Sequence, residues 1–427
     1  MQPQDRGPAV PLSDAITETH RSEWARVVAS LARRFGDLDL AEESAAEAFA
    51  VAVERWPVDG VPPNPGAWLT TTANRKAIDR IRREAKRAGK HEEAEMLYDP
   101  EPPAPLGAVE DERLRLIFTC CHPALAVESR VALTLRLVGG LTVPEIARAF
   151  LVQESAMGQR ITRAKAKIKT AGIPYRVPAA KDLPARVSGV LAVLYLVFNE
   201  GYLATDPAAD PVRSELTGEA IRLTRLLHGL LPDDGEVTGL LALMLLTDAR
   251  RAARVSPSGE LVALDEQDRS AWNAELIADG HRLVRERLAS ARSGSAPGRY
   301  QILAAINAVH TSAGNVHDTH WAQVVALYDQ LARLDRSPIV ALNRAVAAAE
   351  VDGPDLGLAA VERLAGALSG YHPFHAARAD LLRRVNRREE AWTAYGRAIE
   401  LAGNSAEIAA LSRRRGGLFP DASTPAG

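Results

Sequence analysis

The chain has 427 residues, which corresponds to about three domains of ordinary size. Hydrophobic residues make up 47% and charged residues 25% of it, and this ordinary globular composition excludes a wholly disordered protein. Residues 1–180 carry 25 Lys and Arg against 24 Asp and Glu, and residues 181–427 carry 27 against 30. Neither part is strongly basic, so any contact with nucleic acid must come from local patches.

The compartment can be predicted from apolar runs and cysteines. The longest apolar stretch runs from Val187 to Phe198, short of the roughly 20 residues that cross a bilayer. The first ten residues contain no apolar segment typical of a signal peptide. Cys120 and Cys121 are adjacent, and two thiolates alone cannot complete a tetrahedral metal site. We therefore expect a cytoplasmic protein without a membrane segment.

Hydrophobic residues recur at steps of three and four, and runs of alternating Val, Ile and Thr are missing. This pattern predicts an all-α fold: two small helical domains joined by a linker, followed by a large helical domain. Pro- and Gly-rich segments mark the boundaries. The expected parts are a first domain at 15–90, a linker at 91–106, a second domain at 107–175 and a C-terminal region at 185–415.

The C-terminal region contains an internal repeat. The segments VALYDQLARL, AAVERLAGA and TAYGRAIEL align Tyr328 with Val361 and Tyr395, at offsets of 33 and then 34 residues. Helix-pair solenoids of the tetratricopeptide kind have a period of 34 residues. The alternative is chance similarity within an Ala- and Leu-rich helical array. We expect tetratricopeptide-like repeats in about 320–405.

A strongly basic helix is predicted after the loop at 58–66, from Ala67 to about Lys86. Between Arg75 and Lys90 there are eight Lys or Arg residues and two acids. One face is apolar, and the opposite face carries Trp68, Thr72, Arg75, Asp79 and Arg82. Cations beside an aromatic ring are suited to a phosphate backbone and an unstacked base. The alternative is a solvated amphipathic helix whose Trp covers the core.

The second domain contains a helix-turn-helix pattern. Thr142 and Glu145 form a predicted capping box after Gly139 and Gly140, and a second helix is predicted from Glu154 to Lys169. Its apolar face carries Met157, Ile161, Ala164 and Ile168. The opposite face and its edges combine small polar residues with cations, as a helix in a major groove requires. These residues are Ser155, Gln159, Arg160, Thr162, Arg163, Lys165, Lys167 and Lys169. The alternative is an ordinary helical hairpin with a basic solvent face.

Three other groups of residues contain side chains that could form a site. His310, His317, Asp318 and His320 have metal-binding side chains, but their Gly-, Ser- and Asn-rich surroundings favour an exposed loop. Cys120, Cys121 and His122 lie in an apolar run that favours a helix end. The segment 199–201, Asn-Glu-Gly, is interpreted as the capped end of a buried helix. Since phosphate-binding loops and hydrolase or metalloprotease motifs are missing, we expect neither an enzyme nor a cofactor or metal.

With both basic segments in view, residues 20–173 resemble a bacterial RNA polymerase sigma factor of the extracytoplasmic-function type. The segment DLDLAEESAAEAFA followed by GAWLTTTANRKAIDRIRR resembles region two, and LRLVGGLTVPEIARAFLVQESAMGQRITRAKAKI resembles region four, with Leu151 where Gly is usual. Residues 190–202 and 371–404 resemble the subgroup that carries a long tetratricopeptide-like C-terminal extension.

The resemblance implies a role for each segment. Core polymerase would bind the helix that carries Asp39, Ala41, Glu42, Glu43, Glu47 and Phe49. The minus-ten promoter element would lie on Trp68, Thr72, Asn74, Arg75, Asp79, Arg82 and Arg83, and the minus-thirty-five element on the predicted helix at 154–169. The implied partners are core RNA polymerase, promoter DNA and a protein partner of the C-terminal region.

Two other functions remain open on the sequence. One is a helix-turn-helix regulator whose repeat domain senses a ligand or a protein; such a regulator has no need for Trp68 beside a basic helix. The other is a repeat scaffold without DNA contact, which the basic residues at 154–169 argue against.

Overall fold

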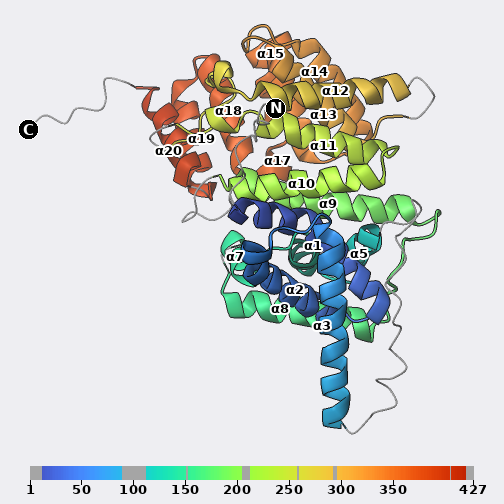
Figure 1. Cartoon of the computed structure of the whole chain (residues 1–427). Coiled ribbons are helices and arrows are strands. Elements are labelled where there is room, and N and C mark those ends of the chain that lie inside the picture. Colours follow the sequence, from blue (N-terminus) through green and yellow to red (C-terminus); the bar gives the residue numbers. More distant parts are fainter. Residues whose placement is uncertain are drawn as a thin grey trace, which may run out of the picture. The chain divides into compact units, whose positions relative to one another are not determined.

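The structure is a computed structural model that describes residues 12–88, 112–150, 152–203, 212–256, 259–291, 296–403 and 405–419. Within these ranges the chain forms helices and no β-strand, apart from one isolated bridge between Val255 and Leu261 (Figure 1). The predicted all-α class is therefore confirmed. The chain divides into two compact units, residues 1–194 and 195–427. The expected linker at 91–106 lies outside the described residues.

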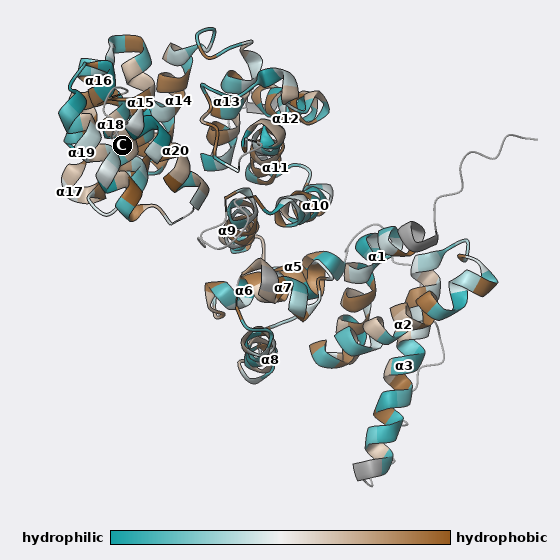
Figure 2. Ribbon diagram, turned by 90° about the vertical axis from the view of Figure 1, so that its left-hand side faces the viewer, coloured by the Kyte–Doolittle hydropathy of each residue, from teal (hydrophilic) through white to brown (hydrophobic). Residues whose placement is uncertain are grey.

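The first unit begins with a bundle of three helices, α1 (Leu12–Phe35), α2 (Leu38–Asp59) and α3 (Pro65–Ala88). Gly36, at φ +65°, ends α1, and the Asp37 side chain caps α2 by accepting bonds from the Asp39 and Leu40 amides. Buried apolar residues from all three helices form the core, among them Val28, Leu31, Ala45 and Leu69. Figures 1 and 2 show the C-terminal half of α3 extending beyond α1 and α2.

The rest of the first unit contains α5 (Glu112–Cys120), α6 (Val127–Leu133), the π-helical turn η1 (Thr134–Val138), α7 (Val143–Ala149) and α8 (Glu154–Thr170). The capping box is confirmed, because the Thr142 amide donates to Glu145 Oε2 at 2.7 Å and the Glu145 amide donates to Thr142 Oγ1 at 3.3 Å. Leu151, in the turn between α7 and α8, lies outside the described residues. The predicted bounds of α8 agree with the structure to within one residue.

These two groups of helices pack against each other. Trp24 Nε1 on α1 donates to the Arg136 carbonyl at 3.2 Å, and the Tyr175 hydroxyl donates to the Ala29 carbonyl at 3.0 Å. Arg33 on α1 pairs with the buried Glu112 on α5 at 3.0 Å. The predicted second domain is therefore held against the first by contacts between residues more than 60 positions apart.

Helix α9 (Leu183–Tyr202) has 20 residues, and the boundary between the two units falls inside it. By length and composition alone it could cross a membrane, and it is the one such helix among the described residues. The helix is longer than the apolar stretch 187–198 because flanking residues extend it at both ends. A single helix of this kind is also typical of the core of a soluble protein. In this chain Val190, Leu191, Leu194 and Val197 of α9 are buried.

The predicted cap at 199–201 is wrong. Gly201 lies inside α9, which continues to Tyr202, so the glycine does not end the helix. Its role is close packing: a Cβ at this position would lie 2.6 Å from the Thr217 amide nitrogen and 2.9 Å from the Arg213 carbonyl oxygen. The Arg213 amide donates to the Gly201 carbonyl at 2.7 Å. The absence of a side chain thus allows the start of α10 (Ser214–Leu230) to approach.

In the second unit, α11 (Gly235–Asp248) is buried along nearly its whole length and packs against α10, α12 (Ala274–Ala291) and α13 (Arg299–Ser312). The Asp234 side chain caps α11 by accepting bonds from the amides of Glu236 and Val237. Two short 3-10 turns, η2 (Arg251–Ala253) and η3 (Arg269–Ala271), interrupt the segment between α11 and α12.

The described residues after α13 continue with α14 (Trp321–Leu334), α15 (Pro338–Asp352), α16 (Pro354–Glu362), α17 (Ala365–Leu368), α18 (His372–Arg384), α19 (Arg388–Leu401) and α20 (Ser405–Gly416). The three segments of the predicted repeat fall on α14, on α16 with α17, and on α19, with α15 and α18 between them. Val361 and Tyr395 are almost completely buried at equivalent positions of the repeat. Whether these helices are tetratricopeptide-like stays a prediction.

Candidate nucleic-acid interface

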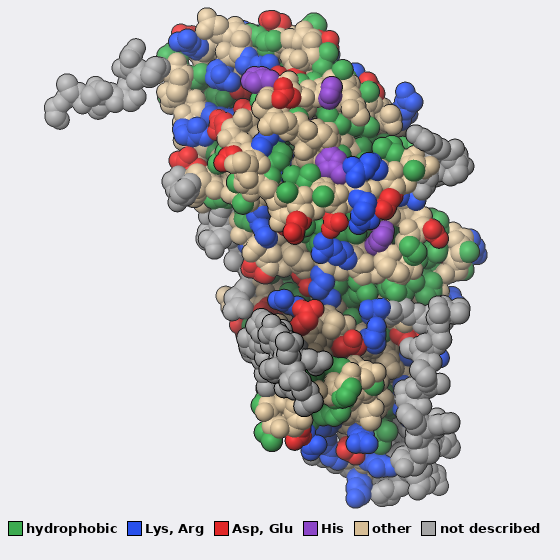
Figure 3. All heavy atoms as spheres, turned by 45° about the horizontal axis from the view of Figure 1, so that its top comes forward, with side chains coloured by type: hydrophobic (Ala, Val, Ile, Leu, Met, Phe, Trp, Pro, Cys, Tyr) green, Lys and Arg blue, Asp and Glu red, His purple; other side chains and the backbone are tan. Residues whose placement is uncertain are grey.

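The outer face of α3 is polar and mostly exposed. Arg75, Asp79, Arg82 and Arg83 are exposed, and Thr72 is half-buried, whereas Leu69, Ala73 and Ala77 on the opposite face are completely buried. Figure 2 shows hydrophilic residues predominating along the outer part of α3, and Figure 3 shows Lys and Arg side chains gathered at its free end. The basic stripe therefore faces solvent, where a phosphate backbone can approach it.

Two predicted members of this face have structural partners. Asn74 is 6% exposed; its Nδ2 donates to the Thr70 carbonyl at 3.0 Å, and its Oδ1 accepts from Arg34 at 3.5 Å. The half-buried Trp68 packs edge-on against the buried Trp56, with ring centroids 5.6 Å apart. Trp68 thus has one side in the core, as the alternative interpretation of this helix predicts, and retains some exposure at the start of α3.

Helix α8 has the two faces that its sequence predicts. Met157, Ile161, Ala164 and Ile168 are buried. Arg160 is half-buried, and the exposed residues include Ser155, Gln159, Thr162, Arg163 and Lys167. Short hydrogen-bonding groups at the centre and cations beside them suit the edges of base pairs and the adjacent phosphates.

Lys165 differs from the rest of this set, because it is 9% exposed and points toward α2. Its Nζ lies 2.8 Å from Asp39 Oδ1 and also pairs with Glu42. Arg136 in η1 makes a second ion pair with Glu42. The sequence placed Lys165 on the promoter side and Asp39 and Glu42 on the polymerase side, and the structure brings them together.

Asp37 and Lys169 extend this group, with Lys169 Nζ 3.4 Å from Asp37 Oδ2. Burial raises the pKa of Asp37, but the hydrogen bond from the Leu40 amide and the nearby Lys169 outweigh it, so the pKa lies below its usual value. We call these six residues the α2–α8 cluster: Asp37, Asp39, Glu42, Arg136, Lys165 and Lys169.

The predicted polymerase-docking residues on α2 separate into two sets. Ala41, Glu42 and Phe49 are buried, and Phe49 packs against the His20 and Trp24 rings at 4.8 Å and 5.8 Å. Asp39 and Glu43 are exposed, and Glu47 is half-buried. Glu43 pairs with Arg80 and Glu47 pairs with Lys76, both on α3. Glu43 and Glu47 therefore lie beside the basic helix α3, whereas Asp39 pairs with α8.

Arg136 was missed by the sequence interpretation. It contacts Glu42, donates from Nη1 to the Leu141 carbonyl at 2.8 Å and lies 5.8 Å from the Trp24 ring. A signal was present, because a single Arg inside the apolar run LTLRLVGG must find a partner if the run is buried. The sequence does not reveal that this partner is Glu42, 94 positions earlier.

The other candidate sites have ordinary roles. Cys120 ends α5 as expected, and burial raises the pKa of the Cys121 thiol to about 11, opposed by its contact with Thr134. Such thiols are poor nucleophiles. His310 lies inside α13 rather than in the loop that carries His317 and His320. Across the described part of the chain, no three His, Cys, Asp or Glu residues are close enough to hold a metal ion.

Three segments of the chain match known protein families. Residues 21–87 match the family described as Sigma-70 region 2, and residues 115–168 match Sigma-70, region 4. Residues 186–288 match a family of unknown function, DUF6596. No solved structure matches the chain.

Individual relatives extend the comparison. An uncharacterized protein of Rhizobium meliloti, R00370, is 42% identical over 408 residues, which cover 94% of this chain and 95% of that protein. The ECF RNA polymerase sigma factor SigK of Mycobacterium tuberculosis H37Rv is 30% identical over 156 residues, 34% of this chain and 80% of SigK. SigK of Mycobacterium ulcerans is 28% identical over 155 residues, covering 80% of that protein.

The helix-turn-helix, the basic helix and these similarities define a bacterial transcription-initiation protein, a class whose members bind core RNA polymerase and promoter DNA and are not enzymes. The chain belongs to the ECF RNA polymerase sigma factors and carries a long helical C-terminal extension. It directs transcription initiation.

Proposed function

We propose that α3 binds the minus-ten element, that α8 binds the minus-thirty-five element, and that the acids of α2 dock on core polymerase. The observation that carries this assignment is the exposed face of α8, where Ser155, Gln159, Thr162, Arg163 and Lys167 are accessible on a capped helix-turn-helix. On this assignment the chain works in the cytoplasm and contributes no catalytic group, since the polymerase synthesises the RNA.

The buried members of the predicted sites act indirectly in this proposal. Ala41 and Phe49 hold α2 in its bundle, and Asn74 holds the middle of α3 against Arg34 on α1. The accessible docking surface consists of Asp39, Glu43 and Glu47. On α3 the DNA-facing residues are Trp68, Thr72, Arg75, Asp79, Arg82 and Arg83.

The α2–α8 cluster has a consequence for binding. While Lys165 pairs with Asp39 and Glu42, Lys165 is not available to DNA and the two acids are not available to polymerase. Binding to polymerase therefore requires α8 to separate from α2. In this proposal the described arrangement is a closed form, and polymerase shifts the population toward an open one.

The assignment of α8 is tested by Arg163→Ala combined with Lys167→Ala. Both side chains are exposed, so the helix should keep its fold, while promoter contacts are lost. We expect run-off transcription with purified core polymerase to fall by about tenfold or more, as two lost contacts of about 1–3 kcal/mol each imply.

The matched control is Arg176→Ala with Lys181→Ala, which removes two exposed cations from the same unit outside α8. If both double variants reduce transcription equally, the effect is one of net charge. If Arg163→Ala with Lys167→Ala transcribes like the wild type, α8 does not bind the promoter.

We also propose that the C-terminal region regulates initiation, through tetratricopeptide-like helix pairs in α14–α20 that bind a protein partner. Solenoids of paired helices commonly present extended protein-binding surfaces. Removing the residues after Leu203 tests this, because it retains α9 and the Arg186 bond to the Phe118 carbonyl at 2.6 Å. The shortened chain should give a different promoter output from the full-length chain in cells. If the two chains give the same output, both in cells and in vitro, the C-terminal region has no regulatory role.

A further inference from the structure

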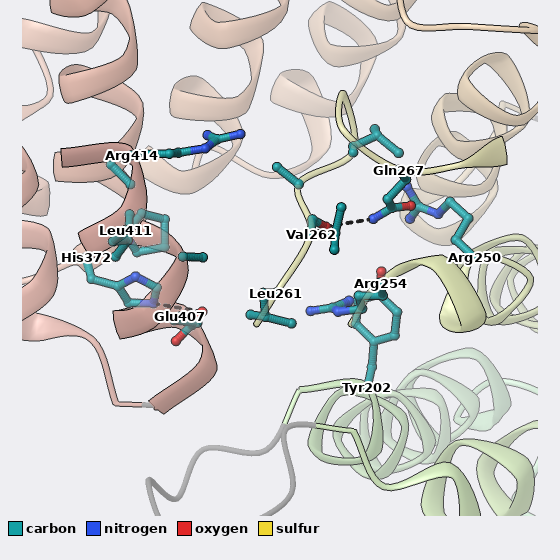
Figure 4. A pocket seen from close by; sticks show the side chains of 15 residues that line it. Tyr202, Arg250, Arg254, Leu261, Val262, Gln267, His372, Glu407, Leu411 and Arg414 are labelled. Atoms are coloured by element: carbon teal, nitrogen blue, oxygen red, sulfur yellow. Dashed lines mark hydrogen bonds and ion pairs between the residues drawn. The ribbon is translucent and has the colours of Figure 1, made fainter. Parts of the chain in front are cut away.

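The second unit contains a pocket of about 390 Å³ whose walls come from distant parts of its sequence (Figure 4). Tyr202 ends α9, Arg250 and Arg254 flank the turn η2, and the segment Leu261–Leu264 follows the isolated bridge. Residues of α18 and α20 form the opposite wall. The Leu261 amide donates to the Ala406 carbonyl at 3.4 Å, and Arg413 pairs with Glu266 at 2.8 Å, which holds the two walls together.

Three guanidinium groups line this pocket, and two of them, Arg250 and Arg254, flank the turn η2. The Arg254 guanidinium lies 3.4 Å from the centroid of the Tyr202 ring, and in Figure 4 it extends toward Leu261. Arg250 donates from Nη2 to Asn307 Oδ1 at 3.1 Å, while its buried Nε has no hydrogen-bond partner among the described residues. Both arginines are thus fixed by neutral groups, an aromatic face and an amide.

Neither guanidinium has a carboxylate at ion-pair distance within the described ranges. Burial lowers the pKa of both Arg250 and Arg254 to about 10. For Arg254, the nearby Glu407 carboxylate partly counteracts this lowering of the pKa. Arg414 on the same pocket provides the contrast, because it pairs with Asp265 at 3.4 Å and with Glu266 at 3.0 Å. A partly buried cation is stabilised by an anion at ion-pair distance, which the two arginines lack among the described residues.

The opposite wall supplies a different surface. Glu407 lies 3.6 Å from His372 Nε2, and the two side chains come from α20 and α18 (Figure 4). Leu261, Val262 and Leu411 add apolar surface between this pair and the arginines. A bare inorganic ion would leave that apolar surface uncovered, whereas an organic molecule would cover it.

We propose that this pocket binds a small organic anion, with a carboxylate or phosphate head held by Arg254 and Arg250 and an apolar body against Leu261, Val262 and Leu411. Guanidinium groups bind both heads through paired N–H donors, and a bound anion would add an ion pair that neither arginine has among the described residues. The assignment is independent of the regulatory role proposed above, because it concerns binding alone.

The test uses the full-length protein and four probes at constant ionic strength: benzoate, phenyl phosphate, the neutral benzamide and inorganic phosphate. Isothermal titration calorimetry should detect binding of benzoate or phenyl phosphate at millimolar concentration. Benzamide should bind at least about tenfold more weakly, as the loss of one charged contact implies. Inorganic phosphate should bind more weakly than phenyl phosphate, because it has no apolar body.

Two variants locate the binding. Arg254→Gln removes one charge, and Ala376→Leu fills the pocket without changing the charge. Each substitution should lower the affinity for the organic anion by about tenfold or more. Arg282→Gln is the control, since Arg282 lies on α12 and pairs with Glu286 at 2.9 Å, away from the pocket lining. Circular dichroism verifies the fold of each variant.

The outcomes separate clearly. Weakening by either folded pocket variant, with Arg282→Gln unchanged, supports the proposal. It is overturned if neither organic anion binds the wild type, if benzamide binds as tightly as benzoate, or if both pocket variants bind like the control. Failure here would leave promoter binding by α8 untouched, because that assignment rests on the first unit.

Discussion

Glu42 is a buried carboxylate that receives two cations, Arg136 from η1 and Lys165 from α8. Removing either cation alone leaves Glu42 with one partner, whereas removing Glu42 leaves Arg136 without its ion-pair partner and Lys165 with the exposed Asp39 alone. The energetic consequences therefore differ, because an unpaired buried charge costs about 3–5 kcal/mol while a rearranged pair costs less. Glu42 is thus the most buried of three acids that pair with α8, the others being Asp37 and Asp39.

His310 gives a prediction about pH at the same scale. Burial, together with Arg250 and Arg269, lowers its pKa from 6.5 to about 4, and its ring packs edge-on against Trp321 at 5.3 Å. In the unfolded chain His310 takes up a proton near pH 6.5, whereas in the folded chain it stays neutral down to about pH 4. The stability it contributes is therefore complete above about pH 6.5 and is lost as the pH falls toward 4.

Between about pH 7.5 and pH 5 this loss should reach about 2 kcal/mol for His310 alone. Other groups titrate in the same interval, so the wild type is compared with His310→Phe. Urea denaturation at both pH values gives the free energy of unfolding of each protein, and the quantity of interest is its loss on acidification. The variant should show the smaller loss on acidification. His317→Phe, in the exposed loop, should behave like the wild type; equal acid sensitivity of all three proteins would contradict the prediction.

At the scale of elements, α9 contains two glycines in opposite situations. A Cβ at Gly201 would lie 2.7 Å from Leu216 Cβ and 2.6 Å from the Thr217 amide nitrogen, whereas a Cβ at Gly189 would meet nothing within 4 Å. The first glycine is required by the contact with α10. The second only weakens the helix, because glycine loses more backbone entropy than alanine when a helix forms.

Gly201→Ala should therefore destabilise the protein by about 1–3 kcal/mol, because α10 must move away from α9. Gly189→Ala in the same helix should stabilise it, by up to about 1 kcal/mol. Differential scanning calorimetry of the two variants and the wild type measures both shifts. Shifts of the same sign and size would show that backbone entropy, rather than close packing, governs both positions.

Local signals in the sequence were sufficient for the helix-turn-helix. Helix periodicity and the Thr142–Glu145 capping box placed α8 and the start of α7 correctly, because each signal acts within a few residues. Gly201 was misread as a cap, since a glycine at a helix end and a glycine at a close helix contact look alike in sequence. The difference depends on α10, whose approach is a tertiary feature.

At the scale of the whole first unit, the burial of Lys165 differs from the predicted site, because it depends on a tertiary contact that the local sequence does not show. The exposed face of α8 followed from its periodicity, but the burial of Lys165 depends on Asp39, 126 positions earlier. Charge alone gave no reason to separate Lys165 from Lys167 on the same helix. The pairing of a predicted promoter-binding residue with predicted polymerase-binding residues emerges only when the two regions pack together.

This packing predicts the behaviour of Lys165→Met. The substitution breaks the pairs with Asp39 and Glu42 but leaves Glu42 with Arg136, and the Asp39 side chain, 62% exposed, can be solvated. The closed form is therefore weakened without an orphaned charge. If only the open form binds core polymerase, apparent affinity depends on the open fraction, so weakening the closed form by about 1 kcal/mol should tighten binding by about fivefold.

Fluorescence anisotropy with labelled protein and core polymerase, without DNA, measures this affinity directly. Lys181→Met is the matched control, because it removes an exposed cation of the same unit outside the α2–α8 cluster. Higher ionic strength should reduce the difference between Lys165→Met and the wild type, since screening weakens the partly exposed pair with Asp39 in the wild type as well. Unchanged or weaker polymerase binding by Lys165→Met would mean that the contact between α2 and α8 does not limit docking.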